Sequence, residues 1–200
     1  MAKGTVTAGQ RPADRPASGR RSLERRRPAG RSAGGSPARV VCLTGPESTG
    51  KSELAARAER ELGATWVHEY AREYAESCSR DLTAADVEPI ARGQIANQDA
   101  ARGSLVVLDT DLISTVVYAR YYYGSCPGWI EAEARRRRAD LYLLLDTDVE
   151  WKPDPARDAG GDAREDLFDA FRATLDEFDT RWEIVSGDHD TRWHRLRDAM

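Results

Sequence analysis

The chain has 200 residues, of which 40% are hydrophobic and 32% charged, and its net charge is −4. Its longest uninterrupted apolar run is Leu141–Leu145, far short of the roughly 18 residues that span a bilayer, and its three cysteines are widely spaced without a CxxC pair. These features exclude a membrane-spanning protein, a disulfide-rich secreted domain and a cysteine-based metal site, and they favour a cytoplasmic protein with no membrane partner.

The first 38 residues differ in composition from the rest of the chain. They carry nine basic side chains against two acidic ones, and alanine, proline, glycine and serine make up most of the remainder. Such a segment buries too little apolar surface to offset the entropy cost of ordering its backbone, so we predict a disordered tail. The tail is either a solvated extension or the one part of the chain suited to a nucleic acid. The folded domain is predicted to span residues 39–200.

Five short apolar segments alternate with segments of helical periodicity. Strands are predicted at 40–44, 65–67, 105–108, 141–145 and 182–186. Helices are predicted at 52–62, 69–77, 83–102, 113–123, 129–139, 163–178 and 189–199. Thr83 and Asp86 have the spacing of a capping box at the start of the third helix. Strands that alternate with helices predict an α/β domain with a mostly parallel five-stranded sheet.

The segment Gly45–Ser52 lies between the first predicted strand and the first predicted helix. It fits G-x-x-x-x-G-K-[ST] in the strand–loop–helix context that this pattern requires. Its glycines allow backbone N–H groups to approach phosphate oxygens, and the helix N-terminus favours negative charge. Lys51 is expected to reach the β- and γ-phosphates of ATP, and the Ser52 hydroxyl to bind Mg²⁺. The predicted ATP-binding residues are Gly45, Pro46, Glu47, Ser48, Thr49, Gly50, Lys51 and Ser52.

Two aspartates follow the third predicted strand, where a phosphate site needs an acidic partner. We predict that Asp109 helps to hold Mg²⁺, through water, together with Ser52. Asp111 is a candidate base or hydrogen-bond acceptor for the hydroxyl of an acceptor substrate. An acid after a strand is also common in turns and helix caps, and we give that interpretation to the similar Asp146 and Asp148.

Two further segments offer polar side chains to a substrate. Glu69, Tyr70 and Arg72 follow the second predicted strand: Arg72 is suited to a phosphoryl or ribose group and Glu69 to a hydroxyl, unless they form a solvated helix face. The Gly- and Asp-rich stretch that contains Arg157 and Arg164 has the composition of a mobile lid. Its arginines would neutralise charge on the transferring phosphoryl group. An ordinary polar loop is the alternative.

Four segments together resemble the ribosylnicotinamide kinase domain of NadR-type proteins: GPESTGKS at 45–52, HEYARE at 68–73, DTDLIST at 109–115 and WKPDPAR at 151–157. The resemblance extends over about residues 40–199. It implies a P-loop NTPase fold, a three-layer sandwich with a lid. The implied activity belongs to NAD biosynthesis: with Mg²⁺ as cofactor, the γ-phosphate of ATP moves to the 5′-hydroxyl of nicotinamide riboside, which yields nicotinamide mononucleotide and ADP.

The resemblance also implies roles for individual residues. The positions that match the family's site are Lys51, Ser52, Asp109, Glu69, Arg72, Arg157 and Arg164. The lid segment departs from the family pattern at Pro155, where a glycine is usual. Two alternatives stay open: a kinase for another nucleoside or metabolite, and a nucleotide-dependent switch or binding module that hydrolyses ATP slowly and holds a partner through its basic tail. The sequence does not determine the acceptor, the catalytic base or the oligomeric state.

Overall fold

The computed structural model describes residues 38–150 and 162–200, apart from the side chain of Asp162. Their five-stranded sheet has the order β2-β3-β1-β4-β5 and is parallel in all four pairings. Its strands are β1 (Arg39–Thr44), β2 (Thr65–Val67), β3 (Leu105–Asp109), β4 (Leu141–Leu145) and β5 (Trp182–Val185). The predicted sheet is confirmed. The tail at 1–37 and the lid segment 151–161, which includes Arg157, lie outside the described residues.

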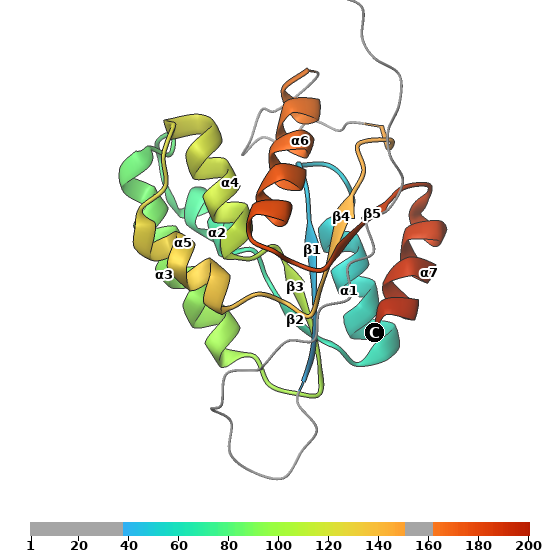
Figure 1. The fold of residues 1–200 in the computed structure, drawn as a ribbon. Helices are drawn as coiled ribbons and strands as arrows, with labels where there is room; N and C mark the ends of the chain where they lie inside the picture. The colour runs from blue at the N-terminus through green and yellow to red at the C-terminus, as the bar shows by residue number, and fades with distance from the viewer. Residues whose placement is uncertain (1–37, 151–161) are drawn as a thin grey trace, which may run out of the picture. The chain divides into compact units, whose positions relative to one another are not determined.

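Helices cover both faces of the sheet and make three layers (Figure 1). On one face lie α1 (Lys51–Leu62) and α7 (His189–Ala199). On the other lie α3 (Val87–Ala100), α4 (Leu112–Tyr123), α5 (Gly128–Arg136) and α6 (Asp162–Glu177), with the shorter α2 (Tyr70–Ser77) packed against α3. No helix in the described parts of the chain has both the length and the apolar character needed to cross a bilayer.

The third predicted helix is divided at its start. The capping box of Thr83 and Asp86 is present, but it opens a short 3₁₀ helix, η1 (Ala84–Asp86), which leads into α3. A capping box satisfies the free N–H groups of any helical start, so the sequence pattern does not distinguish a 3₁₀ turn from the α-helix that follows it.

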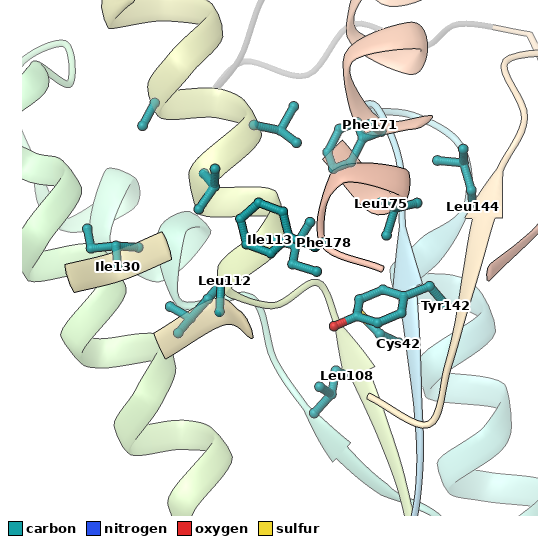
Figure 2. Close-up of a cluster of buried hydrophobic side chains, with 14 of the residues drawn as sticks. Cys42, Leu108, Leu112, Ile113, Ile130, Tyr142, Leu144, Phe171, Leu175 and Phe178 are labelled. Carbon is teal, nitrogen blue, oxygen red and sulfur yellow. The ribbon is translucent and has the colours of Figure 1, made fainter. Parts of the chain in front are cut away.

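Successive strand residues point into two different apolar cores. Cys42, Tyr142 and Leu144 lie in the core that Phe171 of α6 and Phe178, just after this helix, complete (Figure 2). Their neighbours along β1 and β4 lie in the core under α1 and α7. Because β4 is buried on both faces, all five of its residues are apolar. The parallel arrangement places the carboxyl ends of the strands, and the loops that follow them, at one edge of the sheet, where open α/β sheets bind ligands.

Candidate active site

The loop of residues 45–52, here called the phosphate loop, joins β1 to the start of α1. Its backbone enters the left-handed region at Gly45 (φ 123°), Ser48 (φ 56°) and Gly50 (φ 85°). A Cβ at Gly45 would lie 2.9 Å from the carbonyl oxygen of Leu145, so the close approach of β1 and β4 requires glycine. Gly50 is the N-cap of α1, whose first-turn N–H groups have no partner within the helix. This geometry suits an anion.

The Lys51 side chain folds back over the phosphate loop. Its Nζ donates to the carbonyl oxygens of Gly45, at 2.8 Å, and Pro46, at 2.6 Å. The Thr49 hydroxyl, at 3.0 Å, donates to the same Pro46 oxygen. A phosphate would offer the ammonium a charged acceptor, and hydrogen bonds between charged groups are about twice as strong as neutral ones. Lys51 is therefore positioned to bind a phosphate at this loop.

Asp109 ends β3 beside the phosphate loop and is only 3% exposed. Burial raises the pKa of its carboxyl group, although the Ser52 hydroxyl and the Lys51 charge act in the opposite direction. Its Oδ1 is buried and has no hydrogen-bond partner among the described residues. A buried carboxylate oxygen of this kind needs a ligand to compensate for its lost hydration.

The pair of Ser52 and Asp109 fits Mg²⁺. Hydroxyl and carboxylate oxygens are ligands of this ion, and phosphate and water oxygens usually complete its shell. Within 38–150 and 162–200 no three His, Cys, Asp or Glu side chains gather to hold a metal by themselves. A magnesium ion at Ser52 and Asp109 would therefore be shared with nucleotide phosphates, as in other phosphate-loop sites.

Two cavities open beside the phosphate loop. The smaller one, of about 400 Å³, is lined by the loop from Glu47 to Ser52, by Asp109 and by Trp66 and His68 at the end of β2. The larger one, of about 900 Å³, is lined by α2, the segment that leads into η1, and α4. Three residues line both cavities: Glu69, Arg72 and Glu76. The two cavities thus meet at α2, within the range of volumes that small-molecule sites occupy.

Arg80, which lines the larger cavity, is held by a bidentate ion pair. The Arg80 guanidinium donates to both carboxylate oxygens of Asp86 at 2.7 Å, and the Tyr74 hydroxyl donates to one of them at 2.9 Å. Arg80 holds the pKa of Asp86 well below its usual range. Sequence reasoning located Asp86 through the capping box but missed Arg80. Nothing in the residues around Arg80 indicates that the chain turns back to form this bidentate pair.

Glu69 and Arg72 lie where the two cavities meet, as the predicted substrate role requires. Glu69 is 9% exposed at the N-cap of α2, and its Oε2 lies 4.0 Å from Nε of Arg72. Tyr70 lies elsewhere: its N–H donates to Oε1 of Gln94 at 2.8 Å, and its ring covers Gly93, where a Cβ would lie 2.0 Å from a ring carbon. Tyr70 lines neither cavity. The structure thus does not bring Tyr70 to either cavity; it packs α2 against α3.

Asp111, predicted as the acceptor base, is likewise not brought to either cavity. Asp111 is 2% exposed and lines neither cavity. It is the N-cap of α4, where it accepts from the Ile113 N–H at 2.9 Å, and it accepts from the Tyr142 hydroxyl at 2.6 Å. Asp109 and Asp111 do not face the same site, because Thr110 between them has φ 67°. This left-handed residue ends the extended backbone in which alternate side chains share one face.

Burial raises the pKa of Asp111 to about 6, despite its hydrogen bonds from Tyr142 and the backbone. An unfolded aspartate titrates near 3.9, so the folded protein binds this proton more tightly. The stabilisation is complete below about pH 4 and is lost as the pH rises through 6. We expect the unfolding free energy of Asp111→Asn, relative to wild type, to increase by about 2–3 kcal/mol from pH 4 to pH 7.

Urea unfolding at several pH values between 4 and 7 measures this difference. Asp188→Asn is the matched control because Asp188 is also a helix N-cap, and its contact with Thr191 lowers its pKa. For a lowered pKa the sign reverses: the advantage of the wild type over Asp188→Asn exists at neutral pH and shrinks as the pH falls. A difference between wild type and Asp111→Asn that stays constant with pH would contradict the prediction.

Arg164, predicted to lie in a lid, is instead a buried residue of α6. It is 6% exposed and lines neither cavity. It donates to the carbonyl oxygens of Ser48 and Val149, each at 3.0 Å. Its guanidinium is thus anchored on main-chain carbonyls of the described residues, and its predicted contact with a transferring phosphoryl group stays a prediction.

A second buried arginine, Arg192 of α7, was missed by sequence reasoning. It is 2% exposed and donates to the Thr49 carbonyl oxygen at 2.9 Å. It also contacts a carboxylate oxygen of Asp148. The other Asp148 oxygen accepts from the Gly187 N–H, and Asp146 accepts from the Thr147 N–H and the Ser186 hydroxyl. These contacts agree with the interpretation of Asp146 and Asp148 as structural residues at the end of a strand.

Comparison with known proteins relates this chain to an AAA-domain family and to NadR proteins. A family model described as an AAA domain, AAA_28, matches residues 40–192. The trifunctional NAD biosynthesis/regulator protein NadR of Escherichia coli strain K12 is 28% identical over 171 residues, which cover 81% of this chain and 42% of NadR. The chain therefore spans less than half the length of this curated relative.

Solved structures of NadR and of a kinase share the fold of this chain. NadR in complex with NR superposes with a TM-score of 0.70 at 28% identity, over 81% of this chain and 50% of that one. NadR in complex with NAD and AMP-PNP gives 0.62 at 29% identity, over 81% and 48% of the two chains. Thymidylate kinase from Ehrlichia chaffeensis gives 0.60 at 10% identity over 82% of this chain and all of its own, a likeness of fold alone.

Proposed function

Because the chain belongs to the AAA_28 family of AAA domains and is a NadR-type kinase domain, we propose that it transfers the γ-phosphate of ATP to the 5′-hydroxyl of nicotinamide riboside. The products are nicotinamide mononucleotide and ADP. One observation carries this proposal: the phosphate-loop cavity, with Lys51, Ser52 and Asp109, meets a second cavity at Glu69 and Arg72. A nucleotide-binding switch needs the first cavity; a small-molecule kinase needs both.

Within this proposal the smaller cavity holds the triphosphate of ATP. Lys51 binds the γ-phosphate, and backbone N–H groups at the start of α1 bind the other phosphates. Ser52 and Asp109 hold Mg²⁺. When bound, this ion neutralises charge on the phosphate oxygens. A NadR structure in complex with AMP-PNP, an ATP analogue, supports ATP as the phosphate donor.

The acceptor occupies the larger cavity, with its hydroxyl directed at the meeting point of the two. Glu69 is the buried acid at that point, so we assign it the role of general base, which accepts the proton of the attacking hydroxyl. Arg72, also at that point, stabilises charge on the phosphoryl group as its bond to ADP breaks and its bond to the acceptor oxygen forms. A NadR structure in complex with NR, which stands for nicotinamide riboside, supports nicotinamide riboside as the acceptor. Catalysis then depends on positioning and charge.

The decisive experiment measures products by chromatography, with the full chain, Mg²⁺-ATP and a panel of acceptors: nicotinamide riboside, its 5′-deoxy analogue, thymidine, thymidylate and the common ribonucleosides. We expect nicotinamide mononucleotide to form with a kcat of about 1–100 s⁻¹, the range usual for kinases. The 5′-deoxy analogue, which lacks the attacking oxygen, should yield no phosphorylated product.

Each other outcome has a definite meaning. Phosphorylation of a different acceptor would keep the kinase assignment and replace the substrate. ATP hydrolysis without transfer to any acceptor would contradict the kinase proposal and favour a nucleotide-dependent switch.

A further inference from the structure

Two buried arginines hold the side of the phosphate loop that faces away from its N–H groups. Arg164 donates to the carbonyl oxygen of Ser48 at 3.0 Å, and Arg192 to that of Thr49 at 2.9 Å. These are consecutive peptide units. Because a trans peptide is planar, its N–H points opposite to its C=O, so fixing these two carbonyls also fixes the directions of the Thr49 and Gly50 N–H groups.

Arg192 ties the phosphate loop to the ends of two strands. Besides Thr49, it donates to the carbonyl oxygens of Gly187 at 2.7 Å and Asp146 at 3.1 Å, and it pairs with the Asp148 carboxylate. One guanidinium thus joins the loop after β1 to the segments that follow β4 and β5. The fixed fork of donors in arginine makes such a four-way contact possible, whereas the single ammonium of lysine could not reach all of these acceptors.

Arg164 connects the phosphate loop to the start of α6. It bridges Ser48 and Val149, while its Nε is buried without a hydrogen-bond partner among the described residues. Burial and the nearby positive charge of Arg192 lower its pKa. Two cations buried close together are costly unless negative charge lies nearby, and Asp148, Asp146 and Glu47 supply part of that charge at Arg164. The phosphate loop, where a triphosphate would bind, lies directly against both guanidinium groups.

We infer that Arg164 and Arg192 are positioning residues for the triphosphate: they hold the peptide units at 48–50 with their N–H groups toward the phosphates, and the triphosphate charge in turn offsets theirs. Among the described residues, neither side chain lines either of the two cavities above, and both donate to carbonyl oxygens of the loop, so we assign them a role that acts through the loop. The inference rests on the proposed function only in requiring that this loop bind ATP. It predicts that losing either guanidinium weakens binding of phosphates selectively.

The test compares Arg164→Lys and Arg192→Lys with wild type by calorimetric titration of Mg²⁺-ATP and of adenosine, at a temperature where circular dichroism shows every variant folded. We expect the Kd for Mg²⁺-ATP to rise at least tenfold and the Kd for adenosine to change less than threefold. Matched controls are Arg172→Lys on α6 and Arg195→Lys on α7, whose partners are Asp169 and Glu183. Both controls should bind Mg²⁺-ATP as wild type does.

Arg164→Gln, which keeps an amide donor, should also lose affinity for Mg²⁺-ATP and keep its affinity for adenosine. If Arg192→Lys does not fold, the two Arg164 variants test the inference. Unchanged Mg²⁺-ATP affinity in the Arg164 variants, or equal losses for Mg²⁺-ATP and adenosine, would overturn the inference. The second result would indicate a general effect on the fold. Because the readout is binding, a chain that binds ATP but phosphorylates no acceptor would contradict only the proposed function.

Discussion

Lys51→Met is expected to lower phosphoryl transfer by about 100- to 1,000-fold while the protein stays folded. In the structure the Lys51 ammonium contacts the carbonyl oxygens of Gly45 and Pro46, which are neutral acceptors on its own loop. Methionine keeps a similar unbranched stem, so the change removes mainly the charge that would bind the γ-phosphate. An effect of this size is typical when one group that stabilises transition-state charge is lost.

Steady-state transfer to the best acceptor of the panel measures this loss. Arg60→Met is the matched control, because Arg60 is an exposed cation in the last turn of the same helix. It should transfer phosphate at the wild-type rate. Wild-type activity in Lys51→Met would remove the assignment of residues 45–52 as a phosphate site. A loss accompanied by unfolding, detected by circular dichroism, would point to the contacts with Gly45 and Pro46 instead.

Asp109→Asn should raise the Mg²⁺ requirement of phosphoryl transfer without lowering the stability of the fold. It removes a carboxylate from the predicted metal site, and loss of a group that orients a metal's ligands typically weakens metal binding 10- to 100-fold. We therefore expect the Mg²⁺ concentration for half-maximal transfer to rise about 10- to 100-fold. Burial disfavours the charged form of Asp109. An uncharged asparagine avoids this penalty, so the Tm without nucleotide should be equal to or higher than that of wild type.

Transfer rates over a Mg²⁺ titration, together with thermal unfolding, check both parts of this prediction. Asp140→Asn serves as control: Asp140 precedes β4, and its carboxylate accepts from the Val40 N–H at 2.9 Å, at the opposite ends of the strands from the phosphate loop. This variant should lose stability and keep the wild-type Mg²⁺ requirement. An unchanged Mg²⁺ requirement in Asp109→Asn would show that Asp109 does not serve the metal.

The elements could be predicted because the signals for them are local. The apolar run of β4 and the capping box at Thr83 each depend on residues within a few positions of one another, and the structure confirms both. The phosphate loop is equally local, since its glycines and Lys51 lie within eight residues between a strand and a helix. Its place at the edge of the sheet follows from the parallel connection of the strands.

The sequence by itself therefore determined the α/β sheet, the phosphate loop and the pairing of Ser52 with Asp109. Only the tertiary structure decided which nearby polar residues share that site. One left-handed residue, Thr110, turns Asp111 into the core, and Gly93 provides the space that takes Tyr70 away from the cavities. The arginines that hold the loop lie 116 and 143 residues from the carbonyls they bind. Contacts over such separations depend on packing between layers, which leaves no periodic pattern in the sequence.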